Sequence, residues 1–269
     1  MDRRLGVLAF GDSITNGGGE LQWGVALQSW ALWTARGLGL PYTGWAVDGA
    51  TVAGVAGEQV PRFLAGFAHP DARFDLGCLY VGANDVRALD WDAAAYARDL
   101  RAALAFLSER CDRVLACTIP LDLGRPRAGA RVEQANAAIE RAAAEHGALV
   151  LDLRAFAARN LVMADAVHPT AFGQIAIAER ALDVLAADGV DLRVRPSALI
   201  GYETTRWRRL RGDATYMYRQ LKQAARILRL RSATAATRGR EPARGGGPDD
   251  DLAGLRGQGG TSGGAERLV

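Results

Sequence analysis

Short apolar segments alternate five times with segments of helical periodicity between residues 5 and 187, and this alternation limits the fold more than any other feature. Strands that alternate with helices form a parallel sheet covered by helices on both faces, because parallel neighbours need a long crossover connection. Crossovers are right-handed, so we expect a three-layer α/β/α sandwich around a five-stranded parallel, flavodoxin-like doubly wound sheet. The expected strands are residues 5–10, 42–47, 74–81, 113–119 and 148–153.

Helices are predicted in the four connections and after the last strand. In the first connection, Trp23, Leu27, Trp30 and Ala31 recur at helical spacing, and Gly37 is a typical helix stop. The predicted helices are residues 22–37, 55–67, 91–110, 130–146 and 171–187.

The composition changes after this region, which divides the chain into three parts. Residues 1–195 form the expected α/β domain, and residues 196–231 form a basic amphipathic helical extension. Residues 232–269 are rich in Gly, Ala, Arg, Pro and Asp, with almost no large apolar side chains. Such a segment cannot bury enough surface to offset its chain entropy, so we expect it to be disordered.

Residues 205–231, called here the basic segment, contain nine Arg or Lys residues and a single Asp. Three interpretations are open: a surface helix packed on the α/β domain, a helix on an anionic membrane surface, or a contact with nucleic acid or an acidic partner. Trp207, Tyr216 and Tyr218 would suit a membrane interface. No recognition motif accompanies the charge, so we expect no specific nucleic acid.

Cysteine usage and hydropathy indicate the compartment. The three cysteines, Cys78, Cys111 and Cys117, are odd in number and lack paired spacing, which is typical of a reducing environment. No apolar stretch reaches the roughly 20 residues that span a bilayer. We expect a cytoplasmic protein, with peripheral membrane contact through the basic segment as one alternative.

Four short polar segments are expected at the carboxyl edge of the sheet, where open α/β sheets bind ligands. Three follow predicted strands, and the fourth lies in the last loop. They are residues 11–13 (Gly-Asp-Ser), 48–51 (Asp-Gly-Ala-Thr), 82–85 (Gly-Ala-Asn-Asp) and 165–169 (Asp-Ala-Val-His-Pro).

Together these segments contain the groups that acyl transfer requires. Alone, Ser13 could simply cap the following helix. A serine nucleophile needs a base, and His168 is a base of the right type. Asp165, three residues earlier, can orient the imidazole. The sequence therefore predicts Ser13, His168 and Asp165 as catalytic residues.

Acyl transfer also needs donors where the oxyanion forms. The amides of Ser13 and Gly49 and the side-chain NH2 of Asn84 are the candidates, since Gly49 lacks a Cβ and Asn84 donates without charge. Asp12 and Asp85 flank these positions, and we expect them to hold the loops in place. No metal or organic cofactor is expected.

In order and spacing, the four segments resemble the signature blocks of the SGNH, or GDSL, hydrolase superfamily over roughly residues 5–185. The resemblance implies that Ser13 is the nucleophile, that Asn84 completes the oxyanion hole with Gly49, and that Asp165 and His168 complete the triad. Relatives often have an asparagine shortly before the second-block glycine. In this chain that region contains Thr43, Gly44 and Asp48 instead. This departure affects the polarity that the resemblance implies for the substrate pocket.

The resemblance implies a serine esterase that cleaves carboxylic O-acyl esters through an acyl-enzyme. The expected substrate is a small-molecule, lipid or sugar ester. The alternative is an acyltransferase that uses the same triad to move an acyl group to a sugar or lipid alcohol. A non-catalytic binding protein is disfavoured, because Ser13, Asp165 and His168 are all present.

Overall fold

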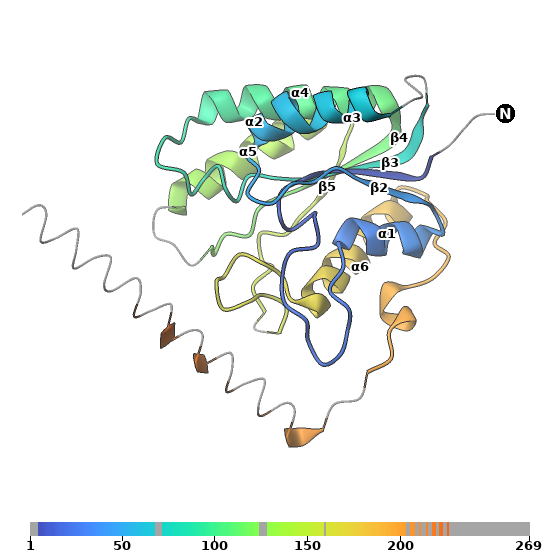
Figure 1. Ribbon diagram of the computed structural model, residues 1–269. Coiled ribbons are helices and arrows are strands. Elements are labelled where there is room, and N and C mark those ends of the chain that lie inside the picture. The colour runs from blue at the N-terminus through green and yellow to red at the C-terminus, as the bar shows by residue number, and fades with distance from the viewer. Residues whose placement is uncertain are drawn as a thin grey trace, which may run out of the picture. The chain divides into compact units, whose positions relative to one another are not determined.

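A single parallel sheet of five strands, in the order β2-β1-β3-β4-β5, forms the centre of the structure (Figure 1). After β1 the chain moves to the edge strand β2 and then returns past β1 to β3, so the topological switch point lies between β1 and β3. This order confirms the flavodoxin-like sheet. The strands are β1 (Val7–Gly11), β2 (Tyr42–Gly44), β3 (Phe74–Tyr80), β4 (Cys111–Cys117) and β5 (Leu149–Leu151).

The computed structural model describes residues 5–67, 72–123, 128–158 and 160–202, together with residues 205–207, 210, 214, 217, 218, 221, 222 and 225. The chain divides into two units, Met1–Ala225 and Arg226–Val269. The second unit, with the tail predicted over 232–269, lies outside the described residues. The boundaries at 195 and 231 stay predictions.

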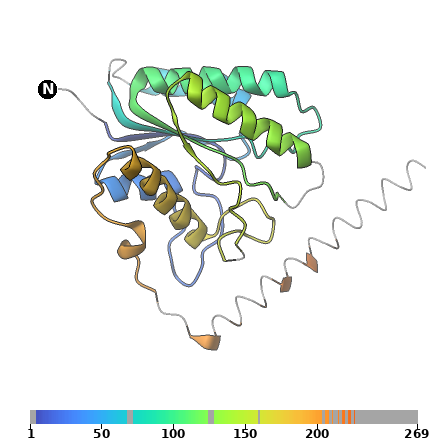
Figure 2. The same cartoon turned by 180° about the vertical axis from the view of Figure 1, so that it is seen from behind.

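Helices cover both faces of the sheet (Figures 1 and 2). Along β1, Val7 and Ala9 pack into one buried cluster while Leu8 and Phe10 pack into another, because successive side chains point to opposite faces. The helices α1 (Trp30–Leu38) and α6 (Ala171–Ala187) cover the Val7 face. The opposite face is covered by α2 (Val52–Gly54), α3 (Val60–Gly66), α4 (Ala93–Arg110) and α5 (Gly129–Glu145).

The predicted helix over 22–37 is wrong for its first eight residues, because α1 begins only at Trp30. Trp23 and Gly24 have φ values of 49° and 82°, and this left-handed backbone cannot continue a right-handed helix. Ser29 then caps α1, its hydroxyl accepting the N–H of Ala31.

The predicted helix over 55–67 is replaced by three consecutive helical segments. After α2 comes a π-helical segment, η1 (Val55–Gln59), and then α3. Pro61 lies in the first turn of α3, directly after the π-helical segment. The π turn matters for the site, because it determines where Glu58 and Gln59 lie.

Cys78, Cys111 and Cys117 are buried free thiols. Burial raises the pKa of Cys111 to about 12 and raises the pKa of the other two as well, which suits packing and not reactivity. No helix in the described part of the chain is both long and apolar enough to cross a membrane.

Beyond α6, the segment Pro196–Leu199 forms a short 3-10 helix (η2). Of the basic segment, Arg206, Trp207, Leu210, Ala214, Met217, Tyr218, Leu221, Lys222 and Ala225 are helical and exposed. Its described large apolar side chains lie at spacings of three, four or seven residues, as on one side of a helix, with Trp207 72% exposed and Leu221 66% exposed.

Candidate active site

Ser13 lies in a turn that begins where β1 ends at Gly11. Gly11 has a φ of 151°, and a Cβ there would lie 2.3 Å from the carbonyl oxygen of Tyr80. Only glycine lets the chain leave the strand this close to β3. The turn is closed by the N–H of Gly18, which donates to the Ser13 carbonyl at 2.6 Å.

Two buried glutamines that the sequence analysis missed hold this turn. Gln59 donates its Nε2 to the Gly11 carbonyl at 2.8 Å and accepts the Gly11 N–H at 3.1 Å. Gln174 donates its Nε2 to the carbonyls of Ile14 and Gly18 at 2.9 and 3.0 Å. Both side chains are at most 2% exposed, so these bonds form away from water. In the sequence, each of these glutamines is recognisable only as a polar residue on the apolar side of a helix, which is a weak indication of a role in the site.

The structure brings together Ser13, His168 and Asp165 from opposite ends of the domain. Nε2 of His168 lies 2.8 Å from Oγ of Ser13, and Nδ1 of the same ring lies 2.6 Å from Oδ2 of Asp165. The other oxygen of Asp165 accepts the N–H groups of Val167 and His168 at 2.9 and 3.0 Å. An imidazole placed between a hydroxyl and a carboxylate can take a proton from that hydroxyl.

The charge states of the pair suit this arrangement. Burial alone would raise the pKa of Asp165, but the hydrogen bonds from the His168 ring and from two backbone N–H groups outweigh it and hold the pKa below its ordinary value. The hydrogen bond that the His168 ring donates to Asp165 raises the pKa of His168 against the opposing effect of burial. The imidazole is therefore a stronger base than a free histidine.

The loops that carry Gly49 and Asn84 are tied to each other and to the Ser13 turn. Asn16 donates its Nδ2 to Oδ1 of Asp48 at 2.9 Å, and Asn84 donates its Nδ2 to the carbonyl of Ala50 at 3.0 Å. The second hydrogen of the Asn84 amide remains available to a ligand. Within the described residues, no acceptor takes the N–H of Ser13 or of Gly49.

Asp85 connects the two loops that border the site. Its carboxylate accepts the N–H of Val52 at 3.0 Å, which joins the loop after β3 to the start of α2. Burial raises the pKa of Asp85 to about 6, against the lowering effect of that hydrogen bond.

Asp12 is 1% exposed, and its Oδ1 accepts the N–H of Ile14 at 2.9 Å. Its other oxygen has no hydrogen-bond partner among the described residues. Burial raises the pKa of Asp12 to about 7, although the Ile14 hydrogen bond and the nearby His168 lower it. Asp12 and Asp85 therefore each accept a backbone N–H from a loop that borders the site.

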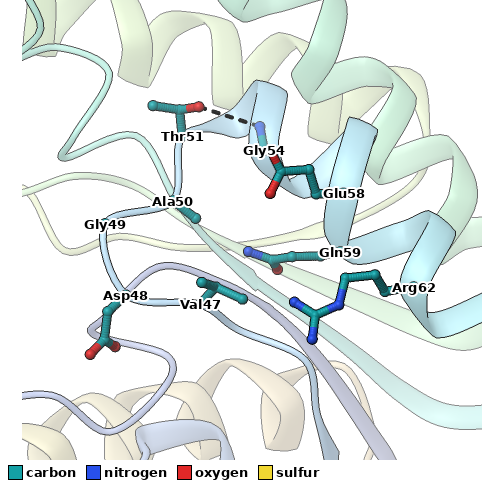
Figure 3. A pocket seen from close by; sticks show the side chains of 9 residues that line it. All are labelled: Val47, Asp48, Gly49, Ala50, Thr51, Gly54, Glu58, Gln59 and Arg62. Carbon is teal, nitrogen blue, oxygen red and sulfur yellow. Dashed lines mark hydrogen bonds between the residues drawn. The ribbon is translucent and has the colours of Figure 1, made fainter. Parts of the chain in front are cut away.

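A cavity of about 260 Å³ lies beside the loop that carries Gly49 (Figure 3). One wall is the loop over 47–51, and the other is formed by η1 and the first turn of α3. The loop over 16–23 and the hydrophobic residues between 153 and 166 do not line it. Among the described residues, no three His, Cys, Asp or Glu side chains are grouped closely enough to hold a metal ion.

One family model and several solved structures match the chain. The model of the GDSL-like lipase/acylhydrolase family matches residues 9–175. LAE5, an alpha/beta hydrolase enzyme from the metagenome of Lake Arreo, has a similar fold, with a TM-score of 0.53 and 21% identity over 67% of this chain and 94% of that one.

A second similar structure is Axe2, an acetyl xylan esterase from Geobacillus stearothermophilus. Its TM-score is 0.53, with 19% identity over 70% of this chain and 96% of that one. At such low identity, both structures establish only the likeness of fold. No curated protein sequence matches the chain.

Proposed function

The chain belongs to the GDSL-like lipase/acylhydrolase family and is a hydrolase of carboxylic esters, and we propose that it cleaves them as a serine esterase with Ser13, His168 and Asp165 as its catalytic triad. The single observation that carries this proposal is the continuous chain of hydrogen bonds from the Ser13 hydroxyl through the His168 ring to the Asp165 carboxylate, at 2.8 and 2.6 Å.

In the first half of the reaction, Oγ of Ser13 attacks the acyl carbon, and its proton passes to Nε2 of His168. Asp165 accepts the Nδ1–H of the ring and stabilises the imidazolium that forms. The tetrahedral intermediate then collapses, its bond to the alcohol oxygen breaks, and His168 returns the proton to that oxygen. The alcohol leaves and the acyl group stays on Ser13.

In the second half, water attacks the acyl-enzyme while His168 takes one of its protons. The acid leaves, and the proton returns to Oγ of Ser13. The oxyanion of both intermediates is held by the N–H groups of Ser13 and Gly49 and by the Asn84 amide. The first two carry no hydrogen bond within the described residues, and the carbonyl of Ala50 fixes the direction of the third.

Axe2 supports these roles without establishing them. Catalytic mutants of that esterase replace a serine, an aspartate and a histidine, and its aspartate and histidine are three residues apart, as Asp165 and His168 are here.

The test is turnover of p-nitrophenyl acetate together with labelling by a fluorophosphonate, read by intact mass. Ser13→Ala should lose activity on the order of 10⁴-fold or more and should not be labelled. The matched control is Ser197→Ala, which changes an exposed serine in η2 and should behave like the wild type. A folded wild type that takes no label, or undiminished turnover by Ser13→Ala, would contradict the proposal.

A further inference from the structure

The cavity beside Gly49 has polar walls and very little apolar side chain. Among the lining residues, Val47 and Ala50 are those with purely aliphatic side chains. The rest of the lining consists of backbone, glycine and polar or charged side chains. Asp48, Gly49, Thr51, Gly54, Glu58, Gln59 and Arg62 make up this remainder.

Charged groups from η1 and α3 border the cavity. Glu58, Gln59 and Arg62 project from the helical wall, and the loop over 47–51 lies opposite (Figure 3). The side-chain amide of Gln59 is already hydrogen-bonded to the backbone of Gly11. Glu58 and Arg62 make no hydrogen bond or ion pair with their side chains in the part of the chain that the structure describes, so both are available to a ligand.

Of the proposed oxyanion donors, Gly49 lies in the cavity wall, whereas Ser13 and Asn84 are not among the lining residues. Gly49, whose N–H is a proposed oxyanion donor, lines the cavity directly. Next to it, Ala50 lines the cavity and accepts a hydrogen bond from Asn84. A Cβ added to Gly49 would meet no atom within 4 Å, so the space beside this residue is open. A group bonded to the reacting carbonyl could therefore extend into the cavity.

The lining chemistry discriminates between the two halves of an ester. An alkyl acyl chain placed here would remove water from Glu58 and Arg62 without replacing their hydrogen bonds, which is unfavourable. Hydroxyl groups can donate to the carboxylate and accept from the guanidinium. Because the two side chains carry opposite charges and Asp48 adds a second carboxylate, a neutral group is favoured over an anionic one.

Resting on the serine esterase mechanism proposed above, we propose that this cavity binds the alcohol part of the ester and selects an uncharged alcohol rich in hydroxyl groups, such as a single sugar ring. A volume of about 260 Å³ lies just below the range typical of drug-sized ligands, as expected for one ring. Glu58 and Arg62 are the residues that determine specificity. The substrate class is then O-acylated sugars and not lipid esters.

The experiment compares two acetate esters that share an acyl group and differ in their alcohol. One is methyl glucopyranoside monoacetate, and the other is p-nitrophenyl acetate, whose alcohol part carries no further hydroxyl. Arg62→Ala and Glu58→Gln should each lower kcat/KM for the sugar ester by about tenfold to a hundredfold, mainly by raising KM. Turnover of p-nitrophenyl acetate, whose alcohol part offers no hydroxyl group to either side chain, should fall much less than turnover of the sugar ester.

Matched controls are Arg101→Ala on α4 and Glu133→Gln on α5, two exposed residues outside the cavity that should change neither substrate. A second measurement needs only soluble wild-type protein. Methyl glucopyranoside without an acyl group should inhibit p-nitrophenyl acetate hydrolysis by the wild type, and Arg62→Ala should weaken that inhibition.

The outcomes separate the two proposals. If the wild type hydrolyses p-nitrophenyl acetate but not the sugar ester, or if the cavity variants affect both esters equally or neither, the cavity assignment is wrong and the triad stands. If Arg62→Ala or Glu58→Gln instead changes the preference for acyl chain length, the cavity binds the acyl part. A wild type that cleaves neither ester and takes no fluorophosphonate contradicts the serine esterase itself.

Discussion

The buried carboxyl group of Asp12 should make the stability of the protein fall as the pH rises, and Asp12→Asn should remove that dependence. Asp12 is 1% exposed, and one of its oxygens has no hydrogen-bond partner among the described residues. Burial raises its pKa from 3.8 to about 7. The ionised form is therefore disfavoured in the folded state relative to the unfolded state.

The sign and size of the effect follow from these two pKa values. A group whose pKa is higher in the folded state stabilises the fold fully below its unfolded pKa and loses that contribution as the pH rises through its folded pKa. Each pKa unit corresponds to about 1.4 kcal/mol, so between about pH 5 and pH 8.5 Asp12 should cost the wild type about 3 kcal/mol of unfolding free energy. Asparagine does not ionise and has no such loss.

Other titratable groups near Asp12 are present in both proteins. These neighbours are His168, Asp85, Tyr80, Tyr96 and Cys117. In Asp12→Asn, the buried side-chain NH2 changes the unfolding free energy by about 1–3 kcal/mol, and this change does not depend on pH. The informative quantity is therefore how the difference between the two proteins changes with pH.

The assay is guanidinium chloride unfolding of both proteins at several pH values between about 5 and 8.5. We expect the unfolding free energy of Asp12→Asn, relative to the wild type, to rise by about 3 kcal/mol across that range. The exposed Asp191→Asn serves as the matched control. A difference between Asp12→Asn and the wild type that stays constant with pH would refute the reasoning.

Three further predictions concern the triad, the oxyanion site and the basic segment. Because Asp165 raises the pKa of the His168 imidazole above 6.5, kcat/KM of the wild type should begin to fall above pH 6.5 as the pH is lowered. Asp165→Asn should move this acid limb to lower pH and reduce kcat on the order of 10³–10⁴-fold. An acid limb that does not move would count against the assignment of Asp165. Asn84→Ala should lower kcat by about 10²–10³-fold with little change in KM for p-nitrophenyl acetate, whereas a loss below about threefold would exclude it as an oxyanion donor. We propose that the basic segment binds anionic membranes through its exposed apolar side chains. The wild type should pellet with phosphatidylglycerol vesicles, whereas the double variant Trp207→Glu and Leu221→Glu should not. The control Leu89→Glu, which changes another exposed leucine, should pellet like the wild type. Wild-type protein that stays in the supernatant, or that binds nucleic acid instead, would reject the membrane contact.

The sequence was sufficient to predict the sheet and the convergence of the polar segments on one edge. Each buried strand reads as a continuous apolar run because both of its faces are covered, and a parallel sheet brings all carboxyl ends to the same side. That topology alone explains how Ser13 and His168, 155 positions apart, meet at 2.8 Å. The contact between Asp165 and the His168 ring could be predicted from the spacing, because the tight turn before His168 lets one carboxylate bind both the ring and the backbone.

The start of α1 could not be predicted, because its apolar spacing has a different cause. Trp23 lies in a loop and packs against Phe172 and Tyr202, with ring centroids 5.3 and 6.2 Å away. Its spacing from Trp30 therefore reflects tertiary contacts and not a shared helix face. The cavity was also hidden, because a π turn shifts every later side chain around the helix axis and helical periodicity does not reveal where such a turn occurs.

The two buried glutamines show why the residues that hold the Ser13 turn are hard to recognise. Gln59 accepts the N–H of Gly11 and donates to its C=O, which also accepts the N–H of Val47. Gln174 supplies donors to two carbonyls of the turn around Ser13. A neutral amide does this without adding a charge that would shift the pKa of His168, whereas a lysine or glutamate in the same place would shift it. The chemistry of the site thus favours uncharged positioning residues, and these are the residues with the weakest signature in a sequence.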